Sequence, residues 1–281
     1  MNVRVARSLA VVVAAVLVAS AALTGCQKVT GDRYVKQLFG WEQVATDETY
    51  RTALDFDLNQ NIELKLDVYQ PVGDTLAQRP VQLWMHGGAW TKGYGTRADI
   101  RGYAQDAARR GYVGVNISYR LRNQAVLPGA ALDAYDDAVA AVAWVKANAA
   151  RFRVDPNAII AAGYSAGSIN AMNLVYPPFE RSPAGPSPVI GAMGIAGQNS
   201  GLPIADRPPV ILFSAVDDGI VAYNGLKARC DADAAAGNIC TLVTYPGGGH
   251  GIAGSQMTDI QTKMAQFAMD TLLPRAGYYK G

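Results

Sequence analysis

A serine between two glycines is the residue of this sequence best suited to nucleophilic chemistry. Ser165 lies at the centre of Gly163-Tyr164-Ser165-Ala166-Gly167, between the apolar run 158–162 and a segment with helical character, 168–175. A Gly-x-Ser-x-Gly between a strand and a helix is typical of a nucleophile elbow, a sharp turn that presents a serine hydroxyl above a sheet. The glycines are needed because a side chain would clash where the backbone doubles back. The pattern therefore predicts that Ser165 is a nucleophile.

The hydroxyl needs a base, and the sequence contains two histidines. A serine hydroxyl is a weak nucleophile until a neighbouring base accepts its proton, and imidazole suits that task near neutral pH. His86 precedes the serine, whereas His250 follows it in a glycine-rich loop after the strand candidate 240–245. The chain order that goes with this elbow is serine, acid, histidine. We predict His250 as the base, rather than a polar residue of a flexible loop, and expect His86 to fix its own loop by hydrogen bonds.

The acid is expected between these two residues, at the end of a strand. Asp217 and Asp218 follow the apolar run 210–215. A buried carboxylate there would hold the imidazole tautomer and stabilise the imidazolium. Adjacent residues of an extended segment point to opposite sides, so only one aspartate can serve. Asp218 is preferred because Asp218-Gly219-Ile220-Val221 resembles the Asp-x-x-Val that closes this strand in related enzymes; Asp217 would then be a solvated turn residue.

A third glycine-rich segment, His86-Gly87-Gly88-Ala89-Trp90, follows the apolar strand candidate 81–85. Acyl transfer requires hydrogen-bond donors aimed at the oxyanion of the tetrahedral intermediate. The usual pair is the amide after the nucleophile, here Ala166, and an amide from this loop, here Gly88 or Ala89. The sequence thus predicts an oxyanion hole and leaves the choice between the two loop residues open.

These motifs together resemble the α/β-hydrolase superfamily, in particular the esterase and lipase branch with His-Gly-Gly-x-Trp that includes hormone-sensitive-lipase-like and feruloyl-esterase-like enzymes. The segments 66–71, 116–121 and 155–167 also resemble that branch, and the likeness extends from about residue 50 to the C-terminus. Two features depart from it. The elbow lacks the aspartate that lipase-like members prefer before the serine, and no sizeable cap insertion is evident.

The periodicity of the chain fits such an architecture. Segments 50–58 and 62–69 alternate around a turn and predict an antiparallel hairpin. Strand and helix candidates then alternate, which implies parallel strands with right-handed crossovers and helices on both faces of a mostly parallel sheet. The strand candidates are 81–85, 112–117, 158–162, 189–195, 210–215 and 240–245, and the helix candidates are 98–110, 130–150, 166–175, 222–236 and 256–272.

The first residues have the character of a targeting segment. Arg4 and Arg7 precede an apolar stretch, 9–18, and Leu23-Thr24-Gly25-Cys26 follows, which resembles the lipobox of bacterial lipoproteins. We expect cleavage before Cys26 and its lipidation, an uncleaved membrane anchor being the alternative. The expected domains are a signal peptide (1–25), a tether (26–49) and the hydrolase domain (50–281). The protein is thus predicted to be exported and anchored to a bacterial membrane, on its periplasmic or cell-surface face.

The cysteines, the net charge and the missing motifs indicate which bonds and ligands to expect. Cys230 and Cys240 remain once Cys26 is set aside, and export favours a disulfide between them over two buried thiols. The formal net charge is +2, so nothing points to a nucleic-acid partner. Metal-ligand motifs and phosphate loops are missing from the sequence. Gly249-His250-Gly251-Ile252-Ala253-Gly254 matches a dinucleotide fingerprint, but too few residues follow it for the rest of that unit.

The sequence therefore predicts a serine hydrolase of carboxylic esters that needs no cofactor. Without a cap the pocket should be open and favour small-molecule esters of short or aryl acids. Trp90, Tyr94 and Tyr164 are candidates for lining it, unless they serve ordinary packing. A peptidase or amidase with the same triad is the enzymatic alternative. A binding protein on a hydrolase scaffold is the third reading, because fold alone does not establish function.

Overall fold

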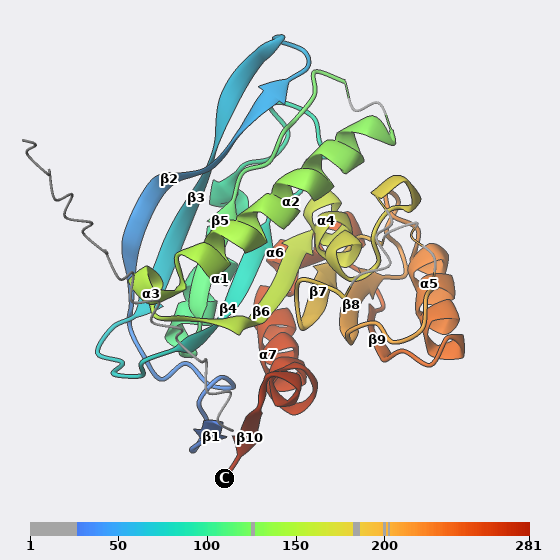
Figure 1. The fold of residues 1–281 in the computed structure, drawn as a ribbon. Coiled ribbons are helices and arrows are strands. Elements are labelled where there is room, and N and C mark those ends of the chain that lie inside the picture. The colour runs from blue at the N-terminus through green and yellow to red at the C-terminus, as the bar shows by residue number, and fades with distance from the viewer. Residues whose placement is uncertain (1–26, 125–126, 182–185, 199–200, 202) are drawn as a thin grey trace, which may run out of the picture.

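A central sheet of eight strands organises the chain (Figure 1). The computed structural model describes residues 27–124, 127–181, 186–198, 201 and 203–281. The strand order is β2-β3-β5-β4-β6-β7-β8-β9; β2, β3 and β5 pair antiparallel, and every later pairing is parallel. The strands are β2 (Trp41–Asp55), β3 (Gln60–Pro71), β4 (Arg79–Met85), β5 (Val113–Ile117), β6 (Val154–Tyr164), β7 (Gly191–Ile195), β8 (Val210–Ala215) and β9 (Cys240–Tyr245).

Helices cover both faces of the sheet, as the alternation of strand and helix patterns predicts. Side chains of α2, α4 and α5 pack in one apolar cluster, and those of α1 and α7 pack in another across the sheet. The helices are α1 (Arg97–Arg109), α2 (Gly129–Ala147), α3 (Ala149–Phe152), α4 (Ala166–Val175), α5 (Tyr223–Ala235), α6 (Ile252–Ser255) and α7 (Met257–Phe267). None of the helices in these described ranges is long and apolar enough to cross a membrane.

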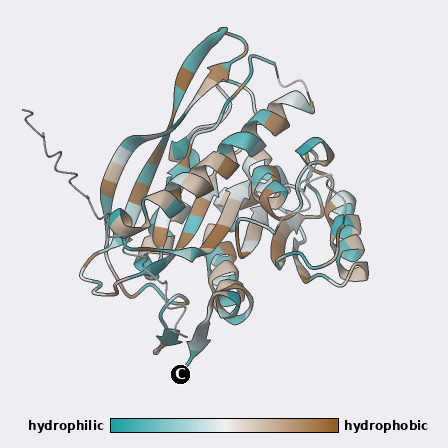
Figure 2. Cartoon of the chain, in the orientation of Figure 1, coloured by the Kyte–Doolittle hydropathy of each residue, from teal (hydrophilic) through white to brown (hydrophobic). Residues whose placement is uncertain are grey.

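Burial on both faces explains why the central strands are almost continuously apolar. In β4, Leu83 and Met85 belong to one cluster and Trp84 belongs to the other, as the two-residue period of a strand requires. The hydropathy colouring shows apolar segments in the central strands and hydrophilic segments along the outer helices (Figure 2). Sheets with parallel strands are ordinarily buried in this way.

Most element boundaries agree with the pattern. The strands 210–215 and 240–245 are found as predicted, whereas the hairpin is longer at its outer ends and β6 begins at Val154. This early start follows from pairing between Val154 and Arg79, ahead of the apolar run. The helix candidate 256–272 is divided, since α7 ends at Phe267 and a π-helical turn, Ala268–Leu272, follows.

The chain from Gln27 to Glu48, expected to be a tether, is part of the folded domain. β1 (Gln27–Val29) pairs in parallel with the last strand, β10 (Tyr278–Lys280). The buried Tyr34 ring packs 4.8 Å from the Tyr112 ring and 5.8 Å from the Tyr278 ring. The tether interpretation was wrong because burial of this aromatic side chain depends on partners far away in the sequence. The proposed signal peptide and Cys26 lie outside the described residues.

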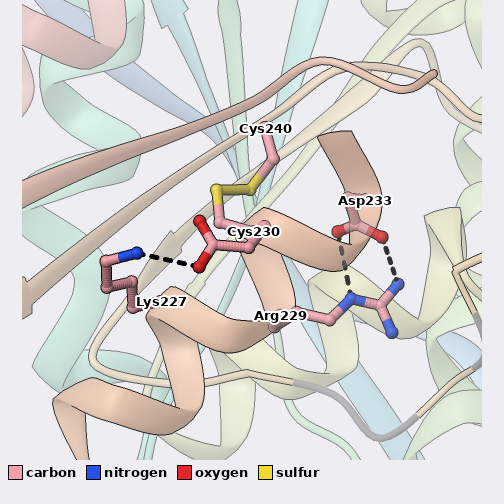
Figure 3. Close-up of a disulfide and its surroundings, with 6 residues drawn as sticks. Lys227, Arg229, Cys230, Asp233 and Cys240 are labelled. Atoms are coloured by element: carbon pink, nitrogen blue, oxygen red, sulfur yellow. Dashed lines mark hydrogen bonds and ion pairs between the residues drawn. A yellow bond between two sulfur atoms is a disulfide. The ribbon is translucent and has the colours of Figure 1, made fainter. Parts of the chain in front are cut away.

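The predicted disulfide between Cys230 and Cys240 is confirmed. It joins α5 to the first residue of β9 across a Cα–Cα distance of 5.2 Å (Figure 3). Beside it, Arg229 and the buried Asp233 form an ion pair, with one guanidinium nitrogen 2.8 Å from a carboxylate oxygen. The disulfide therefore ties α5 to the start of β9, whereas the ion pair joins successive turns within α5.

Candidate active site

Ser165 occupies the sharp turn between β6 and α4. β6 ends at Tyr164 and α4 begins at Ala166, so the serine is the single residue of the turn. Its φ of 53° and ψ of −119° lie in a region that non-glycine residues rarely adopt. The Ser165 N–H donates to the Ile195 carbonyl at 2.8 Å, which ties the strained turn to the end of β7. The predicted elbow geometry is therefore present.

Both glycines of the motif are required because other backbone segments pass too close to leave room for a side chain. A Cβ on Gly163 would overlap the carbonyl group of Gly167, and a Cβ on Gly167 would overlap the carbonyl oxygen of Met85 at the end of β4. Because these obstacles are backbone atoms, they cannot move aside as the end of a flexible side chain can. The turn thus packs tightly against the neighbouring strand.

Three side chains form a continuous hydrogen-bonded chain at the carboxyl ends of the strands. His250 Nε2 lies 2.9 Å from Ser165 Oγ, and His250 Nδ1 lies 2.9 Å from Asp218 Oδ2. Asp218 follows β8 and His250 follows β9. The fold thus brings His250 into contact with Ser165, which lies 85 positions earlier in the sequence. A serine, an imidazole and a carboxylate in this order can activate the hydroxyl as a nucleophile.

The geometry favours Asp218 over Asp217 as the partner of His250. The Asp218 carboxylate is buried and also accepts the N–H groups of Ile220 and Val221, each at 2.9 Å. Burial alone would raise the pKa of Asp218, but these hydrogen bonds and the one from His250 outweigh it and hold the pKa below its ordinary value. The carboxylate is therefore ionised at neutral pH.

Asp217 has a contact that the sequence did not suggest. Its Oδ1 accepts the Gly249 N–H at 2.8 Å, one residue before His250. The expected solvated turn residue thus fastens the loop that carries the imidazole. The two neighbouring aspartates therefore hold the same loop at two adjacent residues, Gly249 and His250.

The loop after β4 brings free backbone donors to the elbow. Gly88 and Ala89 adopt left-handed φ values of 106° and 49°, and a Cβ on Gly87 would lie 2.9 Å from the Tyr164 ring. Within the described ranges, the N–H groups of Gly88, Ala89 and Ala166 donate to no acceptor. That of Ala166 is free because it opens α4. All three amides remain available for an oxyanion, and the choice between Gly88 and Ala89 stays open.

His86 has the structural surroundings expected of it. The side chain is buried, and its Nδ1 lies 2.7 Å from the Gly87 carbonyl oxygen. The Tyr119 ring stacks on the imidazole at 4.4 Å, and the Tyr119 hydroxyl donates to the His86 carbonyl at 2.6 Å. Burial lowers the pKa of His86, so its imidazole is neutral at neutral pH. These contacts hold the backbone of the loop that carries the free amides.

The three aromatic residues expected to line a pocket have different surroundings. Trp90 is buried, donates its indole N–H to Asn170 Oδ1 at 2.9 Å, and borders a hollow of about 260 Å³. Tyr164 donates its hydroxyl to the His250 carbonyl at 2.9 Å. Tyr94 is 78% exposed and is not among the residues that border this hollow. The pocket interpretation of Tyr94 therefore has no support, because its loop turns the side chain towards solvent.

The chain is similar in sequence to known esterases. Residues 66–174 match the family model described as BD-FAE. The chain is 36% identical over 122 residues to phenmedipham hydrolase of Pseudarthrobacter oxydans, covering 42% of this chain and 24% of that protein. It is 34% identical over 139 residues to carboxylesterase 3B of Mus musculus, covering 44% and 24% respectively. The matched region spans about a quarter of the length of these curated relatives.

A solved structure resembles nearly the whole fold. The apo form of Thermogutta terrifontis esterase 2 superimposes with a TM-score of 0.67 at 26% identity, covering 86% of this chain and 97% of that one. The same esterase has also been solved phosphorylated by paraoxon, with a TM-score of 0.67 at 25% identity. These similarities confirm the predicted fold: the chain has the α/β-hydrolase fold, which it shares with this esterase.

Proposed function

We propose that this α/β-hydrolase is a serine esterase that cleaves carboxylic esters through an acyl-enzyme intermediate. The single observation that carries the proposal is the chain of hydrogen bonds from Ser165 Oγ through His250 to Asp218, with both His250 links at 2.9 Å. The similarity to esterases and carboxylesterases of known structure or sequence supports the same reaction class.

Each group has a defined part in the reaction. Ser165 Oγ attacks the ester carbonyl carbon while His250 Nε2 accepts the hydroxyl proton, and the amides of Ala166 and of Gly88 or Ala89 stabilise the oxyanion. His250 then delivers its proton to the leaving alkoxide as the carbon–oxygen bond breaks. A water molecule, deprotonated by the same imidazole, attacks the acyl-enzyme and releases the acid. Asp218 keeps Nδ1 protonated, so that Nε2 is the basic nitrogen.

The size of the site supports short or aryl acids as substrates. The 14 residues between the end of β7 and the start of β8 form no inserted cap domain in the described part of that segment. The hollow beside Trp90 is only about 260 Å³, slightly below the range of about 300–1,000 Å³ for small-molecule pockets. Long acyl chains would extend beyond it into solvent.

A substrate panel tests the reaction class. We expect hydrolysis of p-nitrophenyl esters that is fastest for short acyl chains, and little hydrolysis of aminoacyl p-nitroanilides. Ser165→Ala should lose at least about 10³-fold in kcat while the protein still folds. The matched control is Ser255→Ala on α6, whose exposed hydroxyl is not in contact with the triad. Faster cleavage of the anilides would indicate a peptidase or amidase, and hydrolysis of neither class would indicate a binding protein.

We further propose that Cys26 is lipidated and anchors the exported protein to a bacterial membrane. The basic, apolar and lipobox-like segments before Cys26 support this. The next residue, Gln27, lies in β1 beside β10, whose Tyr278 hydroxyl donates to Asp155 at the amino end of β6. Ser165 follows the other end of that strand, roughly 30 Å away. An anchor at Cys26 would thus leave the triad facing away from the bilayer.

The anchor has its own test. Mass spectrometry of the protein purified from its host membrane should find a diacylglyceryl group on the cysteine at position 26 as the new N-terminus. Cys26→Ser should abolish this modification and leave an uncleaved precursor. A mature N-terminus at another residue, without lipid, would contradict the anchor and leave the esterase proposal untouched.

A further inference from the structure

The hollow beside Trp90 is lined by residues that lie next to the nucleophile elbow in the chain or on the same helix, although Ser165 itself does not border it. It is bordered by the loop after β4, the amino end of α2, α4 and the segment after β7. Trp90 follows Ala89 in the chain, and Ile169 donates its N–H to the Ser165 carbonyl at 3.1 Å. Gln198 follows Gly197, where a Cβ would overlap the Ser165 carbonyl oxygen. Part of a bound substrate can therefore enter the hollow while its carbonyl lies beside Ser165.

The chemistry of the triad indicates which half of an ester enters. His250 must protonate the leaving alkoxide, so the alcohol half lies on the side of the imidazole. No residue of the described segment 217–256, which carries Asp218 and His250, borders the hollow. Tyr164, which packs against His250, does not border it either. The hollow consequently faces the acyl half, and we call it the acyl hollow.

The walls of the acyl hollow combine apolar side chains with amides that lack partners. Trp90, Leu127 and Ile169 supply apolar surface. Asn173 on α4 is 4% exposed, and its amide makes no hydrogen bond to any residue in the described ranges. Gln198 Oε1 is enclosed and also has no partner among those residues. Buried polar groups are hydrogen-bonded in roughly nine cases of ten, so an enclosed amide oxygen without a partner, in the same wall as the Asn173 amide, points to a ligand.

The indole of Trp90 cannot supply the missing partner. Its only N–H already donates to Asn170 Oδ1 at 2.9 Å, one helical turn before Asn173. This bond orients the indole so that its ring, rather than its nitrogen, forms the wall. Hydrogen bonding inside the hollow is thus left to the amides of Asn173 and Gln198.

We propose that the acyl hollow selects esters of short acids that carry a hydroxyl or carbonyl group on the acyl chain, with Asn173 as the specificity-determining residue; this rests on the proposed esterase function. A volume of about 260 Å³ accommodates about nine non-hydrogen atoms at the density of liquid water. A plain alkyl chain of that size fits but leaves the Asn173 amide unsatisfied. An acyl hydroxyl or carbonyl satisfies it, because an amide both donates and accepts.

An isosteric pair of substrates tests this selectivity. p-Nitrophenyl 3-hydroxybutanoate and p-nitrophenyl 3-methylbutanoate have the same leaving group and differ by one hydroxyl in place of one methyl. We expect kcat/KM of the wild-type protein to be about tenfold higher for the better enantiomer of the hydroxy ester. Asn173→Leu should reduce this ratio to about one. Native circular dichroism should show that the variant is folded.

Matched controls make the assignment specific. Asn61→Leu, at an exposed position near the start of β3, should keep the wild-type ratio. For esters that carry the hydroxyl group on the alcohol half, Asn173→Leu should leave the ratio of kcat/KM values unchanged. A wild-type preference for the methyl ester, or a hydroxyl preference that survives Asn173→Leu, would overturn the inference and leave the esterase proposal standing. Hydrolysis of neither ester would overturn the esterase proposal, and this inference with it.

Discussion

Replacing Asp218 by asparagine should disable the triad without disturbing its geometry. The substituted side chain of D218N keeps an oxygen that can accept the N–H groups of Ile220 and Val221, both 2.9 Å away in the native protein. Its amide nitrogen, however, would then face His250 Nδ1 and donate to it. The imidazole would be forced to carry its proton on Nε2, where it cannot accept the proton of the Ser165 hydroxyl.

The expected loss can be estimated from the chemistry of the tautomer. The wrong tautomer removes general-base catalysis almost completely, and the same change in a serine protease triad costs about 10⁴ in kcat. The elbow and the free amides of the oxyanion hole are unchanged, so catalysis above the uncatalysed rate should persist. We therefore expect kcat of Asp218→Asn to fall by about 10³ to 10⁴, which is roughly 4 to 5.5 kcal/mol of transition-state stabilisation.

The assay compares two neighbouring aspartates. Steady-state hydrolysis of p-nitrophenyl butyrate gives kcat and KM for Asp218→Asn and for Asp217→Asn, which keeps an acceptor for the Gly249 N–H. We expect Asp217→Asn to lose less than about fivefold, with both variants showing native circular dichroism. If Asp218→Asn retained a tenth of the wild-type kcat, or if Asp217→Asn were the more damaged variant, the assignment of the acid would be refuted.

Three other perturbations have defined outcomes. Burial raises the pKa of Asp74, but hydrogen bonds from two arginines lower it more, to about 2. Ionised Asp74 therefore stabilises the fold above its unfolded pKa near 3.9, and this stability is lost as pH falls towards 2. In urea titrations, Asp74→Asn should lower the free energy of unfolding by about 2 kcal/mol at pH 7, and this difference should shrink below pH 4. Cys240→Ser should lower the same free energy by about 2.5 kcal/mol, because the disulfide closes a loop of 10 residues, and an unchanged urea midpoint would contradict this. Gly167→Ala should cost about 3 kcal/mol or more, since its methyl group would overlap the Met85 carbonyl, and soluble protein with wild-type thermal stability would show that the elbow is looser than described.

The sequence was sufficient to predict the triad because few candidates existed. Two histidines and a fixed chain order left His250 as the base, and the strand before Asp218 placed the acid at the same edge of the sheet. Short-range signals of this kind, glycine spacing and the alternation of strands and helices, are readable without coordinates. The structure accordingly differs little from the expected central elements.

The features that sequence reasoning missed all depend on contacts between distant segments. Tyr34 is buried by Tyr112 and Tyr278, and nothing in the local sequence of residues 27–49 indicates those partners. The contact of Asp217 with the Gly249 N–H likewise depends on how two loops meet above the sheet. Exposure of Tyr94 follows from the direction in which its loop turns. A signal for the folded N-terminal segment was nevertheless present, since Trp41 and Tyr50 frame an extended stretch with strand character.

The central claim is that Ser165 is an activated nucleophile, and covalent labelling measures this most directly. The protein is treated with a fluorophosphonate, digested, and its adduct is located by peptide mass spectrometry. We expect one adduct per chain, on Ser165, formed slowly in Asp218→Asn and absent in Ser165→Ala. Unmodified protein after prolonged exposure, or an adduct on another residue that persists in Ser165→Ala, would contradict it.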